Sequence, residues 1–353
     1  MTDEHECSWF TSSVGPICSQ GAGPRSELLV LHLEQNGLRG TLPAEVALLE
    51  SLVELRIVGN QIIGNIPSQW SRLVNLKVLE LRDNMLAGGS LPSSLVSLKL
   101  LEVIDLSENR LGGTLPVWFA DFPQLVFLYL GGNGFTNSLP PEWSSLTLLR
   151  ILSLGGNRLT GGIPQSYGEG LVELRELQLG SNLIDEWNPP AWQFQRLEVL
   201  DLGDNLLHRA IPVTLYDLGT LIYLNLADNV ISGELLDNVG FLSALEDLNL
   251  SHNHLVGEIP SELGDGALGM RTLQLQGNEF SGALPGSFRR FRRLELLRVD
   301  DNLLDRVDNV CRGIEDTLIE FYADCVTETG LKCPCCTHCC DKNGLCSEKK
   351  RNL

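Results

Sequence analysis

Residues 149–164 read LRILSLGGNRLTGGIP and combine two local patterns. In the first half, Leu152 and Leu154 alternate with variable residues, which is the period of a short β-strand with one buried face. Asn157 follows this strand, and a glycine and a proline then allow the chain to bend and return. A single strand cannot bury its leucines. The pattern therefore predicts a structure in which copies of this unit stack on one another.

The same pattern occurs twelve times along the chain, with steps of 23 to 25 residues between copies. Each copy follows the apolar frame L-x-x-L-x-L-x-x-N, and nine of the twelve continue to a Leu-Pro or Ile-Pro pair. The asparagine amide both donates and accepts hydrogen bonds, so we expect it to satisfy turn backbone groups in its own copy and in the neighbouring one. These asparagines are Asn36, Asn60, Asn84, Asn109, Asn133, Asn157, Asn182, Asn205, Asn229, Asn253, Asn278 and Asn302.

The composition of the 353-residue chain excludes several classes of function. With 45 acidic and 26 basic side chains the net charge is −19, and a field of this sign repels nucleic-acid phosphates and anionic lipid headgroups. No run of 18 apolar residues is present, so the sequence predicts no transmembrane segment. The N-terminal stretch MTDEHECSWF also does not have the basic and then apolar pattern of a secretory signal. We expect no nucleic-acid partner and no membrane segment in this chain.

The repeat resembles that of leucine-rich-repeat proteins of the extracellular plant type, whose unit reads LxxLxLxxNxLxGxIPxxL. The resemblance covers about residues 28–305 as twelve repeats. It implies an α/β-type repeat solenoid, a right-handed superhelix with a concave parallel β-sheet and disulfide-stapled caps. The front segment CSWFTSSVGPIC resembles the N-terminal cap of the same class, so residues 1–27 are expected to form a cysteine-paired cap. The segment FYADCVTETGLKCPCCTHCC instead resembles the cysteine-dense end of diatom leucine-rich-repeat proteins, and residues 306–353 are expected to form a cysteine-rich cap with a basic tail.

This resemblance implies a recognition module and not an enzyme. It favours the ligand-binding ectodomain of a leucine-rich-repeat receptor-like protein, which takes part in signal transduction by binding a peptide, a protein or an oligosaccharide on its concave face. The alternative is a secreted binder without signalling, such as a hydrolase inhibitor or an adhesive cell-wall protein. Both interpretations place the protein outside the cell or at the cell surface, so a signal or anchor segment is expected to be missing from this chain.

Ten cysteines lie near the two ends of the chain and predict disulfide-bonded caps in an oxidising compartment. The alternative is a zinc–thiolate site that includes Cys336, Cys339 and the intervening His338. Five thiols within eight residues do not form two ligand pairs separated by a loop, so we expect no metal. We predict a Cys7–Cys18 bridge and four tail bridges, with no partners assigned within the tail. The tail cysteines are Cys311, Cys325, Cys333, Cys335, Cys336, Cys339, Cys340 and Cys346. Within this tail, LIEFYADC at residues 318–325 repeats the strand frame once more and then stops.

Residues six, four, two and one positions before each asparagine are expected to point from the concave sheet into solvent. In repeats five to eight, six of these positions hold glycine, which leaves a bare strip bordered by aromatic and acidic side chains. Such a trough suits an extended peptide or an oligosaccharide, because aromatic faces stack on sugar rings and apolar side chains while carboxylates bind hydroxyl or cationic groups. The alternative is that the small residues only ease the curvature of the sheet. The predicted ligand-binding trough comprises Phe127, Tyr129, Gly131, Gly132, Ile151, Ser153, Gly155, Gly156, Gln178, Gly180, Asp201, Gly203, Asp204, Tyr223 and Asp228.

The sequence predicts no catalytic residue and no cofactor. The six histidines are scattered, and the chain contains no H-E-x-x-H motif, nucleophile elbow, P-loop or Rossmann glycine pattern. Glu80 and Asp105 form a carboxylate pair on the predicted concave face. A solvated sheet, however, lacks the burial that raises one pKa in a glycosidase pair, so we interpret these carboxylates as a solvated surface.

Two local features stand outside the regular pattern. Repeat seven, with the residues NLIDEWNPPAWQFQRL, lacks both the glycine and the Leu-Pro or Ile-Pro pair. Within it, Trp187 occupies a slot that normally points outward, so it is either a lateral contact or the cover of a tightened turn. The sequon Asn249-Leu250-Ser251 makes Asn249 a candidate glycosylation site on one N-x-S match. The large residues ten positions after the asparagines, such as Trp143, are expected to fill the core on the convex side.

Overall fold

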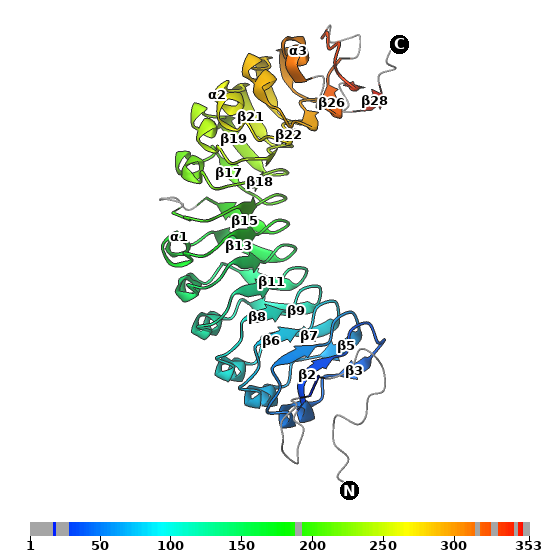
Figure 1. The fold of residues 1–353 in the computed structure, drawn as a ribbon, viewed down its shortest axis with the longest axis vertical. Helices are drawn as coiled ribbons and strands as arrows, with labels where there is room; N and C mark the ends of the chain where they lie inside the picture. Colours follow the sequence, from blue (N-terminus) through cyan, green and yellow to red (C-terminus); the bar gives the residue numbers. More distant parts are fainter. Residues whose placement is uncertain are drawn as a thin grey trace. The chain divides into compact units, whose positions relative to one another are not determined.

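The computed structural model describes residues 17–18, 28–187, 193–314, 318–325, 331–341 and 345–348, with positions 17, 18 and 313 described by their backbone alone. The predicted Cys7–Cys18 bridge lies outside the described side chains. The chain forms two compact units, Met1–Leu174 and Arg175–Leu353. In both units, a typical repeat contributes a short strand, a turn, a second short strand and a helical turn (Figure 1).

In the first unit, the main sheet is formed by β1 and by the strands that end four residues before the repeat asparagines. Successive strands pair in parallel, and β1 pairs with β2 in antiparallel orientation at the edge. In spatial order these strands are β1 (Ile17–Cys18), β2 (Leu28–His32), β4 (Glu54–Arg56), β6 (Val78–Glu80), β8 (Val103–Asp105), β10 (Phe127–Tyr129) and β12 (Ile151–Ser153).

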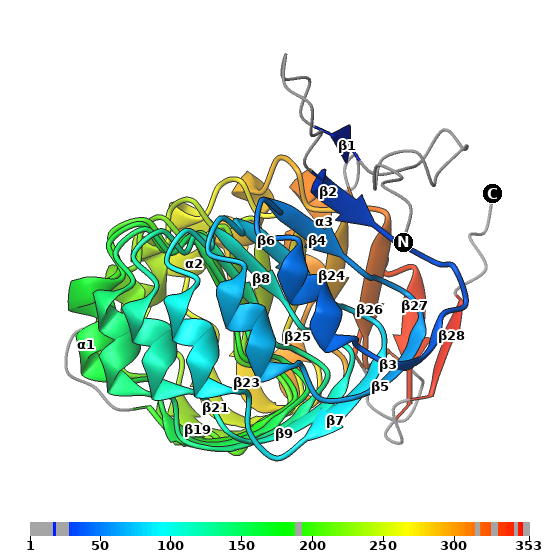
Figure 2. The same cartoon turned by 90° about the horizontal axis from the view of Figure 1, so that it is seen from below.

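A second set of parallel strands follows the asparagines of the first unit: β3 (Arg39–Thr41), β5 (Gln61–Gly64), β7 (Met85–Gly88), β9 (Arg110–Thr114), β11 (Gly134–Asn137) and β13 (Arg158–Gly162). Each of these strands leads to a proline in extended conformation, and a helical turn begins directly after it because proline is well suited to a helix start. The helical turns are η2 (Ala44–Leu48), η3 (Ser68–Arg72), η4 (Ser93–Ser97), η5 (Val117–Asp121), η6 (Pro141–Ser145) and α1 (Gln165–Gly170). Figure 2 shows them stacked along one side of the unit.

The second unit repeats this arrangement. Its main-sheet strands are β14 (Glu176–Gln178), β16 (Val199–Asp201), β18 (Tyr223–Asn225), β20 (Asp247–Asn249), β22 (Thr272–Gln274), β24 (Leu296–Arg298), β26 (Glu320–Ala323), β27 (His338–Cys340) and β28 (Cys346–Glu348). The strands after the asparagines are β15 (Leu183–Glu186), β17 (His208–Arg209), β19 (Val230–Glu234), β21 (His254–Glu258), β23 (Glu279–Ala283) and β25 (Leu303–Arg306). The helical turns are η7 (Val213–Asp217), η8 (Asp237–Phe241), α2 (Glu262–Gly266), η9 (Gly286–Arg290), η10 (Asp308–Val310) and α3 (Cys311–Ile314).

The asparagines connect each repeat to its neighbour. The Oδ1 of Asn157 accepts a hydrogen bond from the backbone N–H of Phe135 at 3.0 Å, and its Nδ2 donates to the carbonyls of Leu130 at 3.1 Å and Leu154 at 2.9 Å. Phe135 and Leu130 belong to the preceding repeat, while Leu154 belongs to the same one. One buried amide therefore satisfies turn groups in two copies, as the repeat pattern predicts.

The core of each unit lies between the main sheet and the helical turns. Leu152 and Leu154 are fully buried, and so are Trp143 and Tyr167. The two aromatic residues also bridge repeats, because Trp143 Nε1 donates to the carbonyl of Pro116 and Tyr167 Oη donates to that of Pro140, both at 3.0 Å. The prediction that the large residues ten positions after the asparagines fill the core is confirmed at these positions.

The tail extends the main sheet and is held together by disulfides. Strand β26 pairs in parallel with β24, β27 pairs in parallel with β26, and β28 pairs with β27 in antiparallel orientation. The sequence frame stops at LIEFYADC, but the sheet continues beyond it into the cysteine-rich segment, which the sequence pattern did not predict. The eight tail cysteines form the bridges Cys311–Cys335, Cys325–Cys339, Cys333–Cys336 and Cys340–Cys346.

Candidate functional site

The solvent-exposed face of the main sheet is where the sequence placed the ligand site, and we call it the open face. In each short strand the central residue is buried and its two neighbours are half-buried, for example in β10 and β12. Because side chains alternate along a strand, the two flanking residues of each strand share the open face. Parallel pairing in constant register then aligns them in rows across the strands.

One row on the open face of the first unit is apolar. Val78, Val103, Phe127 and Ile151 are register partners on adjacent strands β6, β8, β10 and β12, and all four are half-buried. The ring of Phe127 stacks against that of Tyr129, with 6.4 Å between ring centroids and 14° between planes. We call these four residues the apolar row. Strands lie about 4.8 Å apart, so the row is about 14 Å long.

A polar row runs beside the apolar row and begins with two carboxylates. Glu80 and Asp105 are register partners on β6 and β8, and Tyr129 and Ser153 continue the row on β10 and β12. Burial raises the pKa of Glu80, and the Asp105 carboxylate adds to this rise while Arg56 opposes it. The two carboxylates give this part of the face a negative edge.

Charged residues on β2 and β4 continue this polar row. The guanidinium of Arg56 lies 2.7 Å from a Glu80 oxygen and 3.5 Å from a Glu54 oxygen. Glu54 in turn lies 3.3 Å from His32 Nε2. Arg56 is thus shared between two acidic partners and neutralises only part of their charge.

Backbone geometry accounts for part of the glycine strip in the first unit. Gly132 and Gly156 have φ values of +63° and +68°, a conformation that favours glycine. A Cβ on Gly132 would also lie 2.5 Å from the Glu108 carboxylate. The same repeat position has positive φ in other copies that carry polar residues, such as Glu108 and Asp83. Glycine at this position is explained by the positive φ of the turn. The glycine strip by itself therefore does not establish a ligand site.

The open face of the second unit carries a different row. Gln178, Asp201, Asn225, Asn249 and Gln274 are register partners on β14 to β22, and we call them the amide row. Many of its polar atoms already bond within the protein. Asn225 Nδ2 donates to Asp201 Oδ1 at 2.8 Å, and Asp201 Oδ1 accepts the Gly203 N–H at 3.0 Å. Beside this row, burial and the nearby carboxylates of Asp201 and Asp247 raise the pKa of Tyr223.

The predicted trough residues are distributed over both units. On the first unit, β10, β12 and the turns after them bring together Phe127, Tyr129, Gly131, Gly132, Ile151, Ser153, Gly155 and Gly156. On the second unit, β14, β16, β18 and the turns after them carry Gln178, Gly180, Asp201, Gly203, Asp204, Tyr223 and Asp228. Their role as a single binding site stays a prediction.

The expectation that residues two positions before the asparagines face solvent is wrong in much of the second unit. Gly203 and Ala227 are buried there, as are Ser251, Gln276 and Asp300. At Gly203 the cause is direct, because the Asn225 amide nitrogen would lie 2.4 Å from an added Cβ. Side chains of the amide row therefore cover this position.

Three other predicted features can be placed in the structure. Trp187 is 7% exposed, and its Nε1 donates to the carbonyl of His208 at 2.8 Å. It is therefore buried against the neighbouring repeat, which agrees with its interpretation as a cover and not with that as a lateral contact. Asn249 lies half-buried on β20, and its Oδ1 accepts hydrogen bonds from the N–H and hydroxyl of Ser251. Glycosylation of Asn249 stays a prediction.

One group of residues at the end of the second unit was not singled out from the sequence. The guanidinium of Arg298 lies 4.7 Å from the ring centroid of Tyr322, and the ring of His338 stacks on Tyr322 at 4.1 Å between centroids. These residues are register partners on β24, β26 and β27. The sequence did not indicate this stack, because His338 lies in the cysteine-rich segment, where no strand pattern predicts β27.

No helix within the described residues combines the length and the apolar character needed to cross a membrane. The described tail cysteines are consumed in disulfides, so their thiolates are not available as metal ligands.

Comparison with known proteins links the repeats to plant receptors. Two family models, both described as leucine-rich repeat, match residues 74–135 and 195–255, and residues 148–169. Receptor-like protein 35 of Arabidopsis thaliana is 36% identical over 112 residues, which is 32% of this chain and 11% of that protein. The chain thus spans a small part of the length of that relative.

Solved structures show the same fold over most of the chain. The ectodomain of the Arabidopsis thaliana receptor kinase GASSHO1/SCHENGEN3, in complex with CASPARIAN STRIP INTEGRITY FACTOR 2, is 30% identical with a TM-score of 0.63, covering 84% of this chain and 42% of that one. The Arabidopsis receptor kinase HAESA, in complex with the peptide hormone IDA and the co-receptor SERK1, is 29% identical with a TM-score of 0.69, covering 84% and 54%. The repeats, their asparagines and these matches identify the chain as a member of the plant-type leucine-rich-repeat family with a disulfide-stapled C-terminal cap.

Proposed function

We propose that the chain is the ligand-recognition part of a receptor-like protein at the cell surface, and that the open face of its first unit binds an extended peptide with apolar and basic side chains. The observation that carries this proposal is the apolar row beside the carboxylates of Glu80 and Asp105. Half-buried apolar side chains in a continuous row gain free energy when a ligand covers them. The adjacent carboxylates favour a cationic side chain at one end of the ligand.

The dimensions of the apolar row suit an extended chain. The row is about 14 Å long, and five residues of an extended peptide span about 13 Å from the first Cα to the last. Alternate side chains of such a peptide point the same way, so the first, third and fifth would contact the row. A Lys or Arg at the β6 end of this segment would reach Glu80. The expected ligand therefore alternates apolar residues with variable ones and carries a basic residue.

Two further observations support a peptide receptor outside the cell. The structural neighbour HAESA is bound to a peptide hormone, and similarity over 84% of this chain makes a peptide the favoured class of ligand. The disulfide-stapled cap is typical of proteins exposed to an oxidising environment. The relatives that match this chain are receptor-like proteins, which supports the receptor over a secreted binder.

Selection from a displayed library of random nonapeptides on the oxidised chain tests this proposal. We expect enriched sequences with apolar residues at alternate positions and at least one Lys or Arg. Binding of one selected peptide is then measured by calorimetry on the wild-type chain and on Phe127→Ser, which removes the aromatic ring from the apolar row. We expect Phe127→Ser to lower affinity by about tenfold or more, as for an aromatic residue at the centre of an interface.

The matched control is Phe241→Ser, because Phe241 lies on η8 and is 63% exposed. This variant removes an equally large apolar side chain from a different surface, so we expect wild-type affinity. Equal losses in Phe127→Ser and Phe241→Ser would contradict binding on the open face of the first unit. Enrichment of no peptide at all would contradict the proposed class of ligand.

A further inference from the structure

A pocket lies on a different surface, among the strands that follow the asparagines of the second unit. Strands β17 to β25 form one ladder in which β17 is the edge strand, and β15 is not part of that ladder. Two residues before β17, the Leu206 N–H donates to the carbonyl of Ile184 in β15 at 2.9 Å. Further along, the His208 carbonyl accepts a hydrogen bond from the indole N–H of Trp187. A side chain thus acts as the donor here, where a backbone N–H would act in a strand pair. The irregular sequence of repeat seven therefore replaces a strand pair by a side chain.

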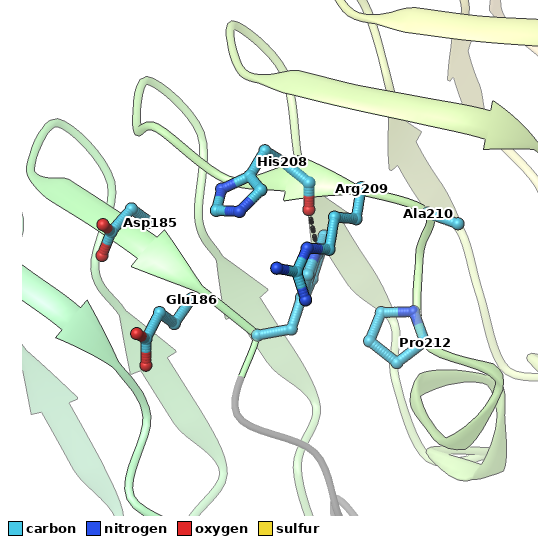
Figure 3. Close-up of a pocket in the computed structure, with 7 residues that line it drawn as sticks. Asp185, Glu186, His208, Arg209, Ala210 and Pro212 are labelled. Atoms are coloured by element: carbon cyan, nitrogen blue, oxygen red, sulfur yellow. Dashed lines mark hydrogen bonds between the residues drawn. The ribbon is translucent and has the colours of Figure 1, made fainter.

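This replacement leaves a pocket of about 490 Å³ beside β15 and β17. Its described lining residues are Asp185, Glu186, Trp187, His208, Arg209, Ala210 and Pro212. Figure 3 shows Asp185 and Glu186 on one side, Pro212 on the opposite side, and the guanidinium of Arg209 reaching between them. A volume of this size lies in the range of small-ligand sites, and the mixture of apolar wall and a few charged groups is typical of them.

Arg209 and Glu186 carry opposite charges in this pocket and do not pair with each other. Glu186 is exposed, and no ion pair joins it to Arg209 within the described part of the chain. The guanidinium of Arg209 likewise has no hydrogen-bond acceptor among the described residues. Elsewhere in the same unit, arginines such as Arg271 and Arg175 are paired with glutamates at 3.1 and 2.6 Å. The charges of Arg209 and Glu186 thus remain available to a ligand.

Arg209 also occupies a backbone position that other repeats give to glycine. It lies four residues after Asn205 and has φ = +68°. The equivalent residues in repeats nine and ten are Gly233 and Gly257, with φ of +85° and +82°. A side chain in this conformation costs free energy and persists where the surrounding structure imposes it, which is frequent at ligand sites. The strain is consistent with a role for the arginine side chain itself.

We propose that this pocket binds a small zwitterion, such as a free amino acid or a dipeptide. Arg209 presents a planar fork of donors that suits a carboxylate. Glu186 presents a negative group on the other side of the pocket, suited to an ammonium group. The side chain of the ligand would pack against Trp187 and Pro212. This inference does not depend on the proposed peptide site, which lies on the main sheet of the other unit.

The test uses the full oxidised chain and three probes that differ only in charge: the dipeptide Ala-Leu, its N-acetyl form and its C-terminal amide. Binding is followed by ligand-observed NMR and calorimetry. We expect saturable binding of Ala-Leu, with each blocked form weaker by about tenfold or more, because each lacks one charge-assisted contact. Equal binding of Ala-Leu and N-acetyl-Ala-Leu would overturn the zwitterion in favour of a simple anion, and no saturable binding would overturn the site.

Two variants locate the binding in this pocket. Arg209→Gly removes the guanidinium but restores the residue type of the neighbouring repeats, so we expect a folded chain that binds Ala-Leu about tenfold more weakly or not at all. Arg306→Gly is the matched control, because Arg306 stands four residues after Asn302 on β25, remote from the pocket lining. It should keep wild-type affinity. Glu186→Gln should weaken Ala-Leu and its C-terminal amide alike, because both carry the ammonium group that Glu186 contacts, and it should leave N-acetyl-Ala-Leu unchanged. Wild-type affinity in Arg209→Gly or Glu186→Gln would contradict the assignment.

Discussion

The open faces of the two units differ in side chains although their strands follow the same repeat frame. On the first unit, Val78, Val103 and Phe127 belong to an apolar row that has carboxylates at its side. On the second unit, Asn225 and its neighbours form an amide row that bonds largely to itself and to the backbone. The repeat frame that both units share lies in buried and turn positions, such as the leucines and the asparagines, and not on the open face. The residues on the open face can therefore vary and bind ligands. The open face of the first unit would gain more free energy when a ligand covers it, because its row is apolar.

The largest expected effect concerns the buried asparagines, which should behave alike in both units. Asn157 and Asn229 each use Oδ1 and Nδ2 to bond backbone groups of two repeats. Replacing either by Leu leaves those buried groups without partners, so each change should cost about 1–3 kcal/mol of unfolding free energy. The urea midpoint measures it.

The same substitution at Asn36 serves as the internal control, because that side chain is exposed and its Nδ2 bonds only to the Glu34 carbonyl within the described residues. It should cost clearly less than the other two. Similar midpoints for all three variants would contradict the role assigned to the asparagines.

A smaller effect should separate the two open faces. Ile151→Asn gives the apolar row the chemistry of the amide row, and we expect affinity for a selected peptide to fall by about tenfold, equivalent to about 1.4 kcal/mol of lost apolar contact. Tyr223→Asn makes a comparable change on the second unit and should leave affinity within about twofold. Calorimetry distinguishes these outcomes, and a greater loss in Tyr223→Asn would move the site to the second unit.

Backbone strain at the pocket predicts a gain in stability. Arg209→Gly should raise the unfolding free energy by about 1 kcal/mol, because glycine adopts positive φ without steric cost. The reverse change, Gly233→Arg, places an arginine at the equivalent position of the next repeat and should lower stability by a similar amount. Thermal unfolding of the two variants provides the measurement. A destabilised Arg209→Gly chain would show that the arginine side chain contributes packing that outweighs its strain.

The smallest effect concerns the pH dependence of the first unit. The pKa of Glu80 is raised in the folded state, so the ionised carboxylate lowers stability above that pKa, and this cost disappears as pH falls below the unfolded value. Glu80→Gln should therefore be more stable than the wild type near neutral pH, and the difference should vanish at acidic pH. Glu142→Gln, at an exposed site on η6, should show no such trend. Urea midpoints between pH 3 and 7 check this.

Much of the fold could be predicted because it depends on local periods. The alternation around Leu152 and Leu154 and the spacing of the asparagines predict the main sheet and its register. The tail was harder to interpret. Strand β27 has the sequence HCC and strand β28 has the sequence CSE. Neither shows an alternation of apolar and polar residues. These strands are also joined by the disulfides Cys325–Cys339 and Cys340–Cys346, and a pattern of apolar and polar residues does not specify which cysteines pair.

The candidate sites were less predictable than the fold. The sequence placed outward residues on the open face, but it did not indicate that Asn225 would cover Gly203. The irregular repeat seven was visible, yet the pocket depends on the Trp187 indole taking the place of a backbone donor. Both outcomes are side-chain packing between repeats, and a periodic pattern does not specify side-chain direction across neighbouring copies.

Photo-crosslinking of a selected peptide tests the central difference between the two faces most directly. The peptide carries a benzophenone at its middle residue, and crosslinked fragments are identified by mass spectrometry. We predict crosslinks to β6, β8, β10 and β12 of the first unit, reduced strongly by unlabelled peptide and by Phe127→Ser. Crosslinks that concentrate on the amide row of the second unit, and that persist in Phe127→Ser, would contradict the account.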